Sequence, residues 1–349
     1  MAKERGKSGK TLADVAQAVG LSTSAVSLAL RGKGGVSEAT RARIVETAAA
    51  MGYAKTAATG PRMPRKAKTV GLLIRAIYGG KPSENVFYGP VMVGVEENCR
   101  ARKLGLMLGV IEFDDKYYPV ELPPIATDRS CDGLIVLGGR LSADSRAAMR
   151  PHPTVLVDAY SDDHYFDSVL IDNFDGAKTA VEHLISLGHR DIAIFGTASD
   201  TFPGIVERRR GYESAIGEAG LSPHYFDAGH EPPEDEPAKA LAYLRTHPEL
   251  TAVFCAYDAI AMMVMRVAAD NGIRIPEHLS VVGFDDIELA AHLNPPLTTI
   301  SVDQVGMGRI AVSLLAHRMA FPNGSVSETR VRTTLVMRES SGPGPATSR

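Results

Sequence analysis

The sequence has no run of about 20 consecutive apolar residues, the length that a membrane-spanning helix needs. Its first ten residues are polar and basic and no apolar stretch follows them, so we find no secretory signal peptide. Of its 349 residues, 44% are hydrophobic and 23% are charged, as in globular proteins. We therefore expect a cytoplasmic protein without a membrane segment, built from two or three domains.

Cysteine is scarce, and the three cysteines are too far apart to form a motif. Cys99, Cys131 and Cys255 are odd in number and include no C-x-x-C pair. A disulfide framework or a zinc site does not fit this spacing, so we expect reduced thiols in the core.

The motifs of common enzyme classes are also missing. The sequence has no G-x-S-x-G elbow, no Walker lysine loop and no H-E-x-x-H, and its ten histidines form no ligand-spaced cluster. Residues 306–311 fit a dinucleotide fingerprint, but they fall inside an expected helix. His183, His189 and Asp191 are residue types that can bind a metal. However, Gly188 before His189 is a helix-ending signal, and a single His at such a position usually has a structural role. We expect no catalysis, no metal and no cofactor.

Charge is unevenly distributed along the chain. Residues 1–68 hold thirteen Lys and Arg but only four Asp and Glu, whereas the remainder holds 25 basic and 37 acidic residues. This division predicts a small module that binds a polyanion, attached to a larger body that does not. A basic tail surrounded by solvent is the alternative that charge alone leaves open.

The basic segment has the pattern of three short helices. Thr11 to Asp14 form a capping box, and Gly20 ends the first helix. Ser22 caps a second helix that ends at Gly32, and a third runs from Ser37 to Met51. Two short helices joined by a tight turn are typical of a helix-turn-helix domain, whose second helix enters the DNA major groove.

Residues 11–53 carry a specific family pattern. The matching positions are Thr11, Asp14-Val15-Ala16, Gly20, Ser22, Val26-Ser27, Val36-Ser37, Thr40-Arg41 and Gly52-Tyr53. The segment resembles the DNA-binding domain of the LacI/GalR family of bacterial transcription regulators.

This resemblance implies which residues contact DNA. It puts the base-contacting positions at Thr23, Ser24 and Leu28. Leu28 can touch a thymine methyl group but cannot make a bidentate hydrogen bond. We interpret Arg31, Lys33 and Arg41 as phosphate contacts, with solvated surface charge as the alternative for each. The full set of expected DNA contacts is Thr11, Ser22, Thr23, Ser24, Ser27, Leu28, Arg31, Lys33, Ser37, Arg41, Tyr53 and Arg62.

The segment after Tyr53 departs from the family pattern. Relatives continue with a short hinge helix whose leucine wedges into the minor groove, but Gly60, Pro61 and Pro64 interrupt a helix here. We expect residues 54–68 to form an extended basic linker, with Arg62 near phosphates and no sharp operator kink. Met63 is the one alternative wedge.

The body of the chain alternates apolar runs with helix-length segments. This alternation indicates doubly wound parallel sheets in two lobes. The expected strands are residues 70–74, 106–111, 133–137, 154–158, 192–195, 252–255 and 280–284. The family resemblance continues at Asp172-Asn173, Leu187–Arg190, Gly283–Asp286 and Pro295–Ile300, and it implies the periplasmic sugar-binding fold as a sensor.

The expected fold is therefore an all-α helix-turn-helix domain followed by an α/β two-lobe sensor. We expect the DNA-binding domain at 1–53, the linker at 54–68, the sensor at 69–340 and a disordered tail at 341–349. The family fold crosses between lobes three times, and we place these crossings near residue 171, residues 297–301 and residues 326–330.

A ligand cleft is expected at the carboxyl ends of both sheets. Asp158, Arg208 and Asp258 are the main candidates, since carboxylates accept and a guanidinium donates hydrogen bonds to a polyhydroxylated ligand. Tyr257 stands where the family usually has Asn, which leaves the ligand class open. Tyr78, Phe87 and Tyr88 are candidates for apolar walls, or for ordinary core and surface residues.

The resulting hypothesis is a homodimeric regulator, expected to be a repressor, that binds double-stranded operator DNA under control of a small molecule. A carbohydrate is the first candidate for the effector, and a purine or another metabolite is the second. A sugar-binding protein without DNA activity and a Rossmann-type enzyme are the alternatives of other classes.

Overall fold

The computed structural model describes residues 11–30, 36–51, 68–75, 86–150, 152–197, 202–227 and 235–345. It divides into two compact units, residues 1–66 and 67–349. Among the described residues, no single helix is long and apolar enough to cross a membrane. Helices α1 and α2 are long and apolar enough only when taken together, and they are bent by 103° relative to each other.

The first unit contains the three expected helices, α1 (Leu12–Val19), α2 (Thr23–Leu30) and α3 (Glu38–Ala50). Thr11 and Asp14 make a reciprocal capping box at the start of α1, and Gly20 ends it with φ 69°. That left-handed conformation favours glycine, so the turn between α1 and α2 follows from local sequence. A small core holds the three helices together, formed by Val15, Ala16, Val19, Val26, Ala29, Ile44 and Ala48.

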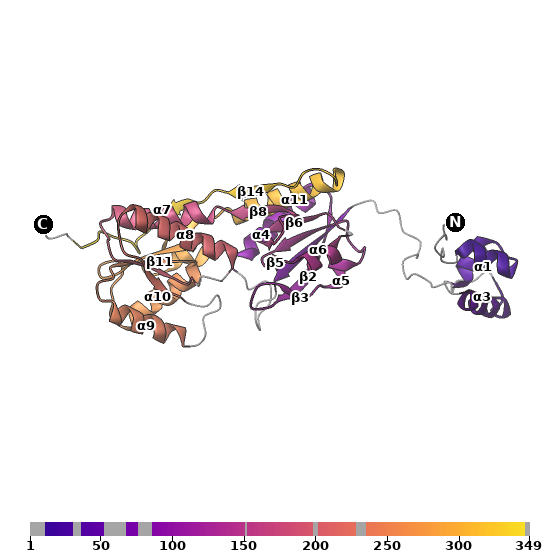
Figure 1. Ribbon diagram of the computed structural model, residues 1–349, viewed down its shortest axis with the longest axis horizontal. Coiled ribbons are helices and arrows are strands. Elements are labelled where there is room, and N and C mark those ends of the chain that lie inside the picture. The colour runs from indigo at the N-terminus through magenta and orange to yellow at the C-terminus, as the bar shows by residue number, and fades with distance from the viewer. Residues whose placement is uncertain are drawn as a thin grey trace, which may run out of the picture. The chain divides into compact units, whose positions relative to one another are not determined.

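The second unit has two lobes, each built around one sheet (Figure 1). The sheet of the N lobe has the strand order β14-β8-β6-β4-β1-β2-β3, parallel except for the antiparallel β2–β3 pair. Its strands are β1 (Thr69–Arg75), β2 (Gly105–Phe113), β3 (Pro119–Glu121), β4 (Gly133–Leu137), β6 (Thr154–Val157), β8 (Asp167–Ile171) and β14 (Glu328–Val331). A separate two-stranded sheet pairs β5 (Arg140–Leu141) with β7 (Tyr160–Ser161).

Helices cover both faces of the N-lobe sheet. One face packs against α4 (Tyr88–Ala101) and α11 (Gln304–Ala320), and the other against α5 (Pro124–Thr127) and α6 (Ala143–Met149). Because β1, β4 and β6 are buried on both faces, they are mostly apolar runs in the sequence, as expected for parallel strands.

The C lobe repeats this architecture. Its strand order is β10-β9-β11-β12-β13-β15, parallel except for the antiparallel β13–β15 pair. The strands are β9 (Ile192–Phe195), β10 (His224–Phe226), β11 (Ala252–Cys255), β12 (Ser280–Asp285), β13 (Thr298–Ser301) and β15 (Thr334–Val336). The helices are α7 (Asn173–Ser186), α8 (Pro203–Glu218), α9 (Glu236–Thr246), α10 (Asp258–Asp270) and the short 3-10 helix η2 (Glu288–His292). All seven strands expected from the sequence are present.

Two lobe crossings lie later in the chain than we expected. Strand β13 pairs with β12, so the chain leaves the C lobe only after Ser301, and not within residues 297–301. Strand β14 pairs with β8, so the third crossing follows Val331 and not residues 326–330. Both strands are short and polar, so a search for apolar runs does not find their boundaries.

The segment expected as a disordered tail is ordered over its first residues. The Gly342 amide donates to Ser280 Oγ at 3.0 Å, and the Gly344 amide donates to the Leu187 carbonyl at 2.8 Å. The ring of His189 is 2% exposed and lies within hydrogen-bond distance of Ser280 Oγ and the Gly342 carbonyl. The expectation was therefore wrong for residues 341–345, and residues 346–349 lie outside the described part of the chain.

The three cysteines are free and buried, as expected. The glycines of the apparent dinucleotide fingerprint lie in α11. A Cβ on Gly308 would clash with the Val91 carbonyl oxygen of α4, so this glycine permits the close approach of α4 and α11. A Cβ on Gly306 would instead meet the side chain of Asp303, which caps α11 and accepts from the Gly306 amide.

A buried ion pair closes the edge of the N lobe. Arg318 Nε lies 2.7 Å from Asp167 Oδ2, and the backbone amide of Ser327 donates to Asp167 Oδ1 at 2.8 Å. The two side chains are only 11% and 4% exposed. Burial opposes ionisation, but the hydrogen bonds from Arg318 and Ser327 outweigh it and lower the pKa of Asp167.

We predict that Asp167→Asn lowers the free energy of unfolding by about 3–5 kcal/mol, because it leaves Arg318 buried without a counter-charge. The difference from wild type should be largest near neutral pH. It should shrink as the pH falls through the folded-state pKa, because wild-type Asp167 then loses its charge too. Urea denaturation followed by circular dichroism measures both effects.

The matched control is Asp163→Asn, which removes the partner of Arg146 at 2.9 Å in a more exposed ion pair. Its loss should be within about 1 kcal/mol. Equal losses for the two variants would contradict the importance of the buried pair.

Candidate functional site

Helix α2 exposes a row of hydroxyl side chains at its amino-terminal end. Ser22, Thr23 and Ser24 are exposed, and Ser27 and Leu28 are partly exposed. The opposite side of the helix is anchored in the core by Val26 and Ala29. The first turn of α2 thus presents short polar groups on a helix whose orientation is fixed by packing, the arrangement that helix-turn-helix proteins use in the major groove.

Three of the expected DNA-contacting residues have local structural roles. The Thr11 hydroxyl accepts from the Asp14 amide at 3.3 Å, and the Ser22 hydroxyl accepts from the Ala25 amide at 3.2 Å. Ser37 caps α3 by accepting from the Thr40 amide at 3.2 Å. These caps set where each helix begins.

Arg41 is partly buried on α3 and lies 3.2 Å from Glu38. Five other residues that we singled out lie outside the described residues: Arg31, Lys33, Tyr53, Arg62 and Tyr78. The same holds for residues 54–67 of the linker, including Met63.

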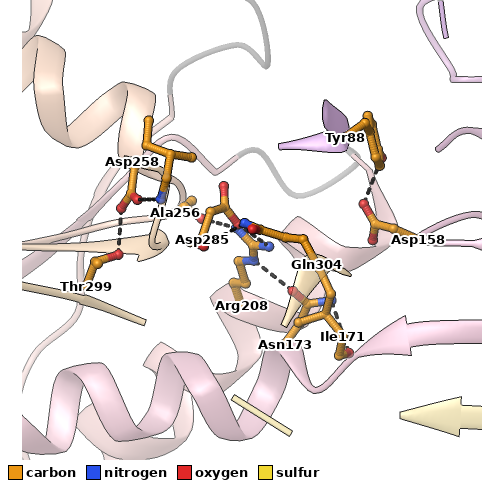
Figure 2. Close-up of polar contacts among 11 residues, drawn as sticks. Tyr88, Asp158, Ile171, Asn173, Arg208, Ala256, Asp258, Asp285, Thr299 and Gln304 are labelled. Atoms are coloured by element: carbon orange, nitrogen blue, oxygen red, sulfur yellow. Dashed lines mark hydrogen bonds and ion pairs between the residues drawn. The ribbon is translucent and has the colours of Figure 1, made fainter. Parts of the chain in front are cut away.

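On the N-lobe side of the sensor, Asp158 follows β6 at the carboxyl end of the sheet. It has φ 44°, a left-handed conformation unusual for a residue other than glycine, and it is 7% exposed. The Tyr88 hydroxyl donates to Asp158 Oδ2 at 2.8 Å (Figure 2). Gly138 leaves room for this contact, since a Cβ there would lie 2.8 Å from the Tyr88 oxygen.

Burial controls the protonation of this pair. Removal from water raises the pKa of Asp158 to about 7, against the hydrogen bond from Tyr88 and the charge of Arg208. Burial and the nearby carboxylate also raise the pKa of Tyr88, so its hydroxyl keeps its proton and donates. At neutral pH, Asp158 is therefore close to its own titration point.

Arg208 occupies the centre of the site (Figure 2). Its Nε donates to Asn173 Oδ1 at 2.8 Å, Nη1 donates to the Ala256 carbonyl, and Nη2 lies 3.1 Å from Asp285 Oδ1. The guanidinium carbon lies 3.7 Å from the ring centroid of Phe284. One buried cation thus joins the start of α7 to the carboxyl ends of β11 and β12.

The neighbouring arginines point elsewhere. Arg209 pairs with Glu213 and Asp227, at 3.2 and 3.0 Å, and Arg210 is exposed. Of the three consecutive arginines, Arg208 is therefore the one whose side chain is buried.

Asp285 is a central residue that our sequence analysis did not select. It ends β12 with φ 113°, and it is 9% exposed. Burial raises its pKa to about 6, while the charge of Arg208 acts in the opposite direction. Among the described residues, no hydrogen-bond donor of acceptable geometry reaches its Oδ1 atom. This oxygen is the one that lies 3.1 Å from Arg208 Nη2, so the two side chains form a buried ion pair.

Asp258 does not line the cleft, contrary to our expectation. It is fully buried at the start of α10, where Oδ1 accepts from the Thr299 hydroxyl at 2.6 Å and Oδ2 from the Ile287 amide at 2.9 Å. Both oxygens are thus engaged inside the C lobe (Figure 2). Through its hydrogen bond from the Ile287 amide, Asp258 holds the segment that follows Asp285 in place.

Aromatic side chains from both lobes meet beside this polar centre. Tyr117 and Tyr160 of the N lobe each pack edge-on against Phe202 of the C lobe, with ring centroids 5.3 Å apart in both pairs. Tyr257, one of the expected ligand residues, is partly buried against the same cluster. Phe87 instead packs on Tyr88 and the core of the N lobe.

Sequence patterns contained signals for two residues that we did not select. Asn173 and Asp285 both belong to segments that resemble the family, and Asp285 directly ends an apolar strand. Gln304, whose side-chain amide donates to the Asp285 carbonyl at 2.9 Å, carried no such signal.

The arrangement suits recognition of a polar ligand better than bond cleavage. It offers carboxylates from both lobes and one permanent cation that is already held by protein acceptors. Within the described part of the chain, no group of three or more His, Cys, Asp or Glu side chains is placed to hold a metal ion.

Two family models match the chain. The model of bacterial regulatory proteins of the lacI family matches residues 11–55, and that of a periplasmic binding protein-like domain matches residues 181–341. The ribose operon repressor of Haemophilus influenzae is 32% identical over 334 residues, which cover 95% of this chain and 98% of that protein.

Solved structures agree over most of the length. The transcriptional regulator CelR in complex with cellobiose has 27% identity and a TM-score of 0.67, covering 95% of this chain and 100% of that one. A LacI family transcriptional regulator from Enterococcus faecium with bound ribose has 25% identity and a TM-score of 0.68, covering 80% of this chain and 100% of that one. The resemblance seen in residues 11–53 is confirmed, and the chain belongs to the lacI family of bacterial regulatory proteins, which regulate transcription and are not enzymes.

Proposed function

We propose that this regulator is a repressor whose binding to operator DNA is controlled by a monosaccharide, with a pentose such as ribose as the first candidate. The observation that carries the proposal is the Arg208–Asp285 pair at 3.1 Å, placed at the strand ends of the C lobe opposite Asp158 and Tyr88 of the N lobe. The proposal includes a cytoplasmic location, where a bacterial operator lies.

The chemistry of the site favours a ligand rich in hydroxyl groups. Asp158 and Asp285 are nearly buried, and burial raises the pKa of each although Tyr88 and Arg208 lie beside them, so further hydrogen-bond donors would favour their ionised forms. Sugar hydroxyls donate hydrogen bonds to carboxylates and accept them from guanidinium groups. The named ligands of the relatives, ribose and cellobiose, belong to this class.

The position of the site couples a ligand to the arrangement of the lobes. Asp158 and Tyr88 belong to the N lobe, whereas Arg208 and Asp285 belong to the C lobe. Gln304, the first residue of α11 in the N lobe, already donates to the backbone of Asp285. A ligand that contacts both sides favours one lobe arrangement, and such coupling between sites amounts to about 1–3 kcal/mol.

DNA reading is assigned to the exposed face of α2, with Thr23, Ser24 and Leu28 toward the bases and Arg41 toward phosphate. The proposed assembly is a homodimer. Its support is an exposed apolar surface on the N lobe, where Leu108 and Val110 of β2 are 57% and 47% exposed. Two-fold symmetry of the protein then requires a nearly palindromic operator.

For the effector site, we predict that D-ribose raises the thermal unfolding midpoint of the wild type by more than that of Asp285→Asn at the same ribose concentration. The variant loses a charged acceptor, which weakens binding by about 10–100-fold. Asp270→Asn, an exposed residue of α10, is the control with the same change of charge and should respond like wild type.

The same screen should contain other pentoses, hexoses and hypoxanthine. A shift with hypoxanthine alone would assign the effector to the purines and reject the sugar proposal. An undiminished ribose shift in Asp285→Asn would remove Asp285 from the site.

The effector affinity should also depend on pH. Hydroxyl donors favour the ionised carboxylates, so binding lowers the raised pKa values of Asp158 and Asp285 and releases protons. Affinity for D-ribose should therefore rise with pH between about 5 and 8. Isothermal titration across this range, in buffers of different ionisation enthalpy, measures both the affinity and the proton release. Affinity that is constant or higher at acidic pH contradicts this assignment.

For DNA binding, we predict that Thr23→Ala and Ser24→Ala each weaken binding to a selected operator by about 1–3 kcal/mol, because each loses contact with a base edge. Thr47→Ala on α3 is the matched control, since its hydroxyl donates only to the Arg43 carbonyl of its own helix at 2.8 Å. Arg41→Gln should instead reduce the slope of log affinity against log salt by about 1.

Fluorescence anisotropy with an operator selected from a random DNA library, and with an unrelated duplex, gives these values. If the α2 variants lose affinity equally for both duplexes, the base-reading assignment fails. A wild-type affinity that does not change with salt would rule out the phosphate contacts.

A further inference from the structure

A second pocket, of about 610 Å³, lies between the lobes and is separate from the residues of the effector site. Its walls come from β6, β8 and β14 of the N lobe, from the segment around β7, and from the first half of α8 in the C lobe. Neither Asp158, Arg208 nor Asp285 lines it.

Helix α8 contributes a single face to this pocket. Pro203, Val206, Glu207 and Arg210 follow the spacing i, i+3, i+4, i+7, which places them on one side of a helix. Arg208 lies on a different side, where it binds Asn173 and Asp285. The same helix therefore serves two sites with two of its faces.

The N-lobe sheet likewise presents one face to the pocket and the other to the hydrophobic core. Ser168 and Leu170 of β8 alternate with Val169 and Ile171, and only the first pair lines the pocket. Val169 and Ile171 point into the core between the sheet, α4 and α11. The sheet thus forms the floor of the pocket, and the apolar lining residues are Leu156, Ala159, Phe166, Leu170, Pro203, Val206 and Val326.

Cationic groups with spare hydrogen-bonding capacity surround the apolar floor. Arg210 is exposed and makes no hydrogen bond or ion pair with any residue that the structure describes. Arg140 pairs with Asp162 through Nη2 at 3.2 Å, but its Nε is buried and has no partner in the described part of the chain. The Tyr160 hydroxyl is also buried, and it has no hydrogen-bond partner in the described part of the chain.

The two acidic groups of the lining share one cation. Glu207 and Glu328 both pair with Arg330, at 3.2 and 2.8 Å. Helix α8 also begins at the pocket, with Pro203 in its first turn and no side-chain cap on its amides. Its dipole adds positive potential at that end.

We propose that this pocket is a second ligand site, and that it binds a small organic carboxylate with a ring-sized apolar body. The apolar floor accommodates the body of the ligand, and the guanidinium groups of Arg140 and Arg210 bind its carboxylate. Because the walls come from both lobes, an occupant stabilises this lobe arrangement from a site separate from the sugar cleft.

Benzoate is the probe, and the neutral isostere benzamide is its comparison. In isothermal titration or saturation-transfer NMR with the full chain, benzoate should bind at least about tenfold more tightly than benzamide, because only benzoate carries a charge for the guanidinium groups. Arg210→Gln should weaken benzoate binding by about tenfold. Val206→Trp, which places an indole ring in the pocket, should abolish it.

Arg266→Gln is the control, since Arg266 is exposed on α10 and gives the same change in net charge. It should leave benzoate binding unchanged, and circular dichroism should show that all three variants are folded. The proposal is overturned if wild type does not bind benzoate, or if benzamide binds equally well. It is also overturned if Val206→Trp still binds benzoate, or if Arg266→Gln weakens binding as much as Arg210→Gln.

Discussion

The buried guanidinium of Arg208 is the interaction on which the sensor depends. Its donors reach Asn173 at the first lobe crossing, the carbonyl at the end of β11 and the carboxylate at the end of β12. These three points belong to segments far apart in the sequence, and each would otherwise leave a buried acceptor unsatisfied. Loss of this one side chain would therefore disturb the hinge and the effector site together. A buried charge held by several polar partners fixes geometry more strictly than apolar packing does.

Buried acidic residues outnumber that cation in and around the site, and this imbalance determines the chemical character of the sensor. Asp158, Asp258 and Asp285 are all buried, and burial raises the pKa of each. Both oxygens of Asp258 accept hydrogen bonds within the C lobe, so this carboxylate has a structural role. Asp158 and Asp285 lie at the strand ends of opposite lobes, beside Tyr88 and Arg208. The fold thus holds buried carboxylates where a further donor from a ligand would favour the ionised form, which is a physical basis for ligand selectivity.

Local sequence rules predicted the elements well, whereas relations between distant elements were harder to predict. The capping box at Thr11 and the turn at Gly20 depend only on neighbouring residues, and both were foreseen. Asp258 and Asp285 both lie beside strand ends, and chain order does not tell which carboxylate is covered by Thr299 and which meets Arg208. That choice depends on where β13 lies against β12, and β13 is too polar to be recognised as a buried strand. Sequence therefore located the edge of the sheet that forms the site, but not every side chain in it.

Helix α8 can connect two separate sites while it moves as a rigid body. Arg208 holds one of its faces to the effector site, while Val206, Glu207 and Arg210 turn another face to the second pocket. Glu207 also pairs with Arg330 of β14, so the helix is tied to the N lobe at a second place. A rigid-body shift of α8 relative to the N lobe must therefore change both pockets at once. Packed helices are stiff, so free energy from a ligand at either face acts on the same lobe equilibrium. Because both sites share this rigid helix, coupling between them requires no chain of residues from one site to the other.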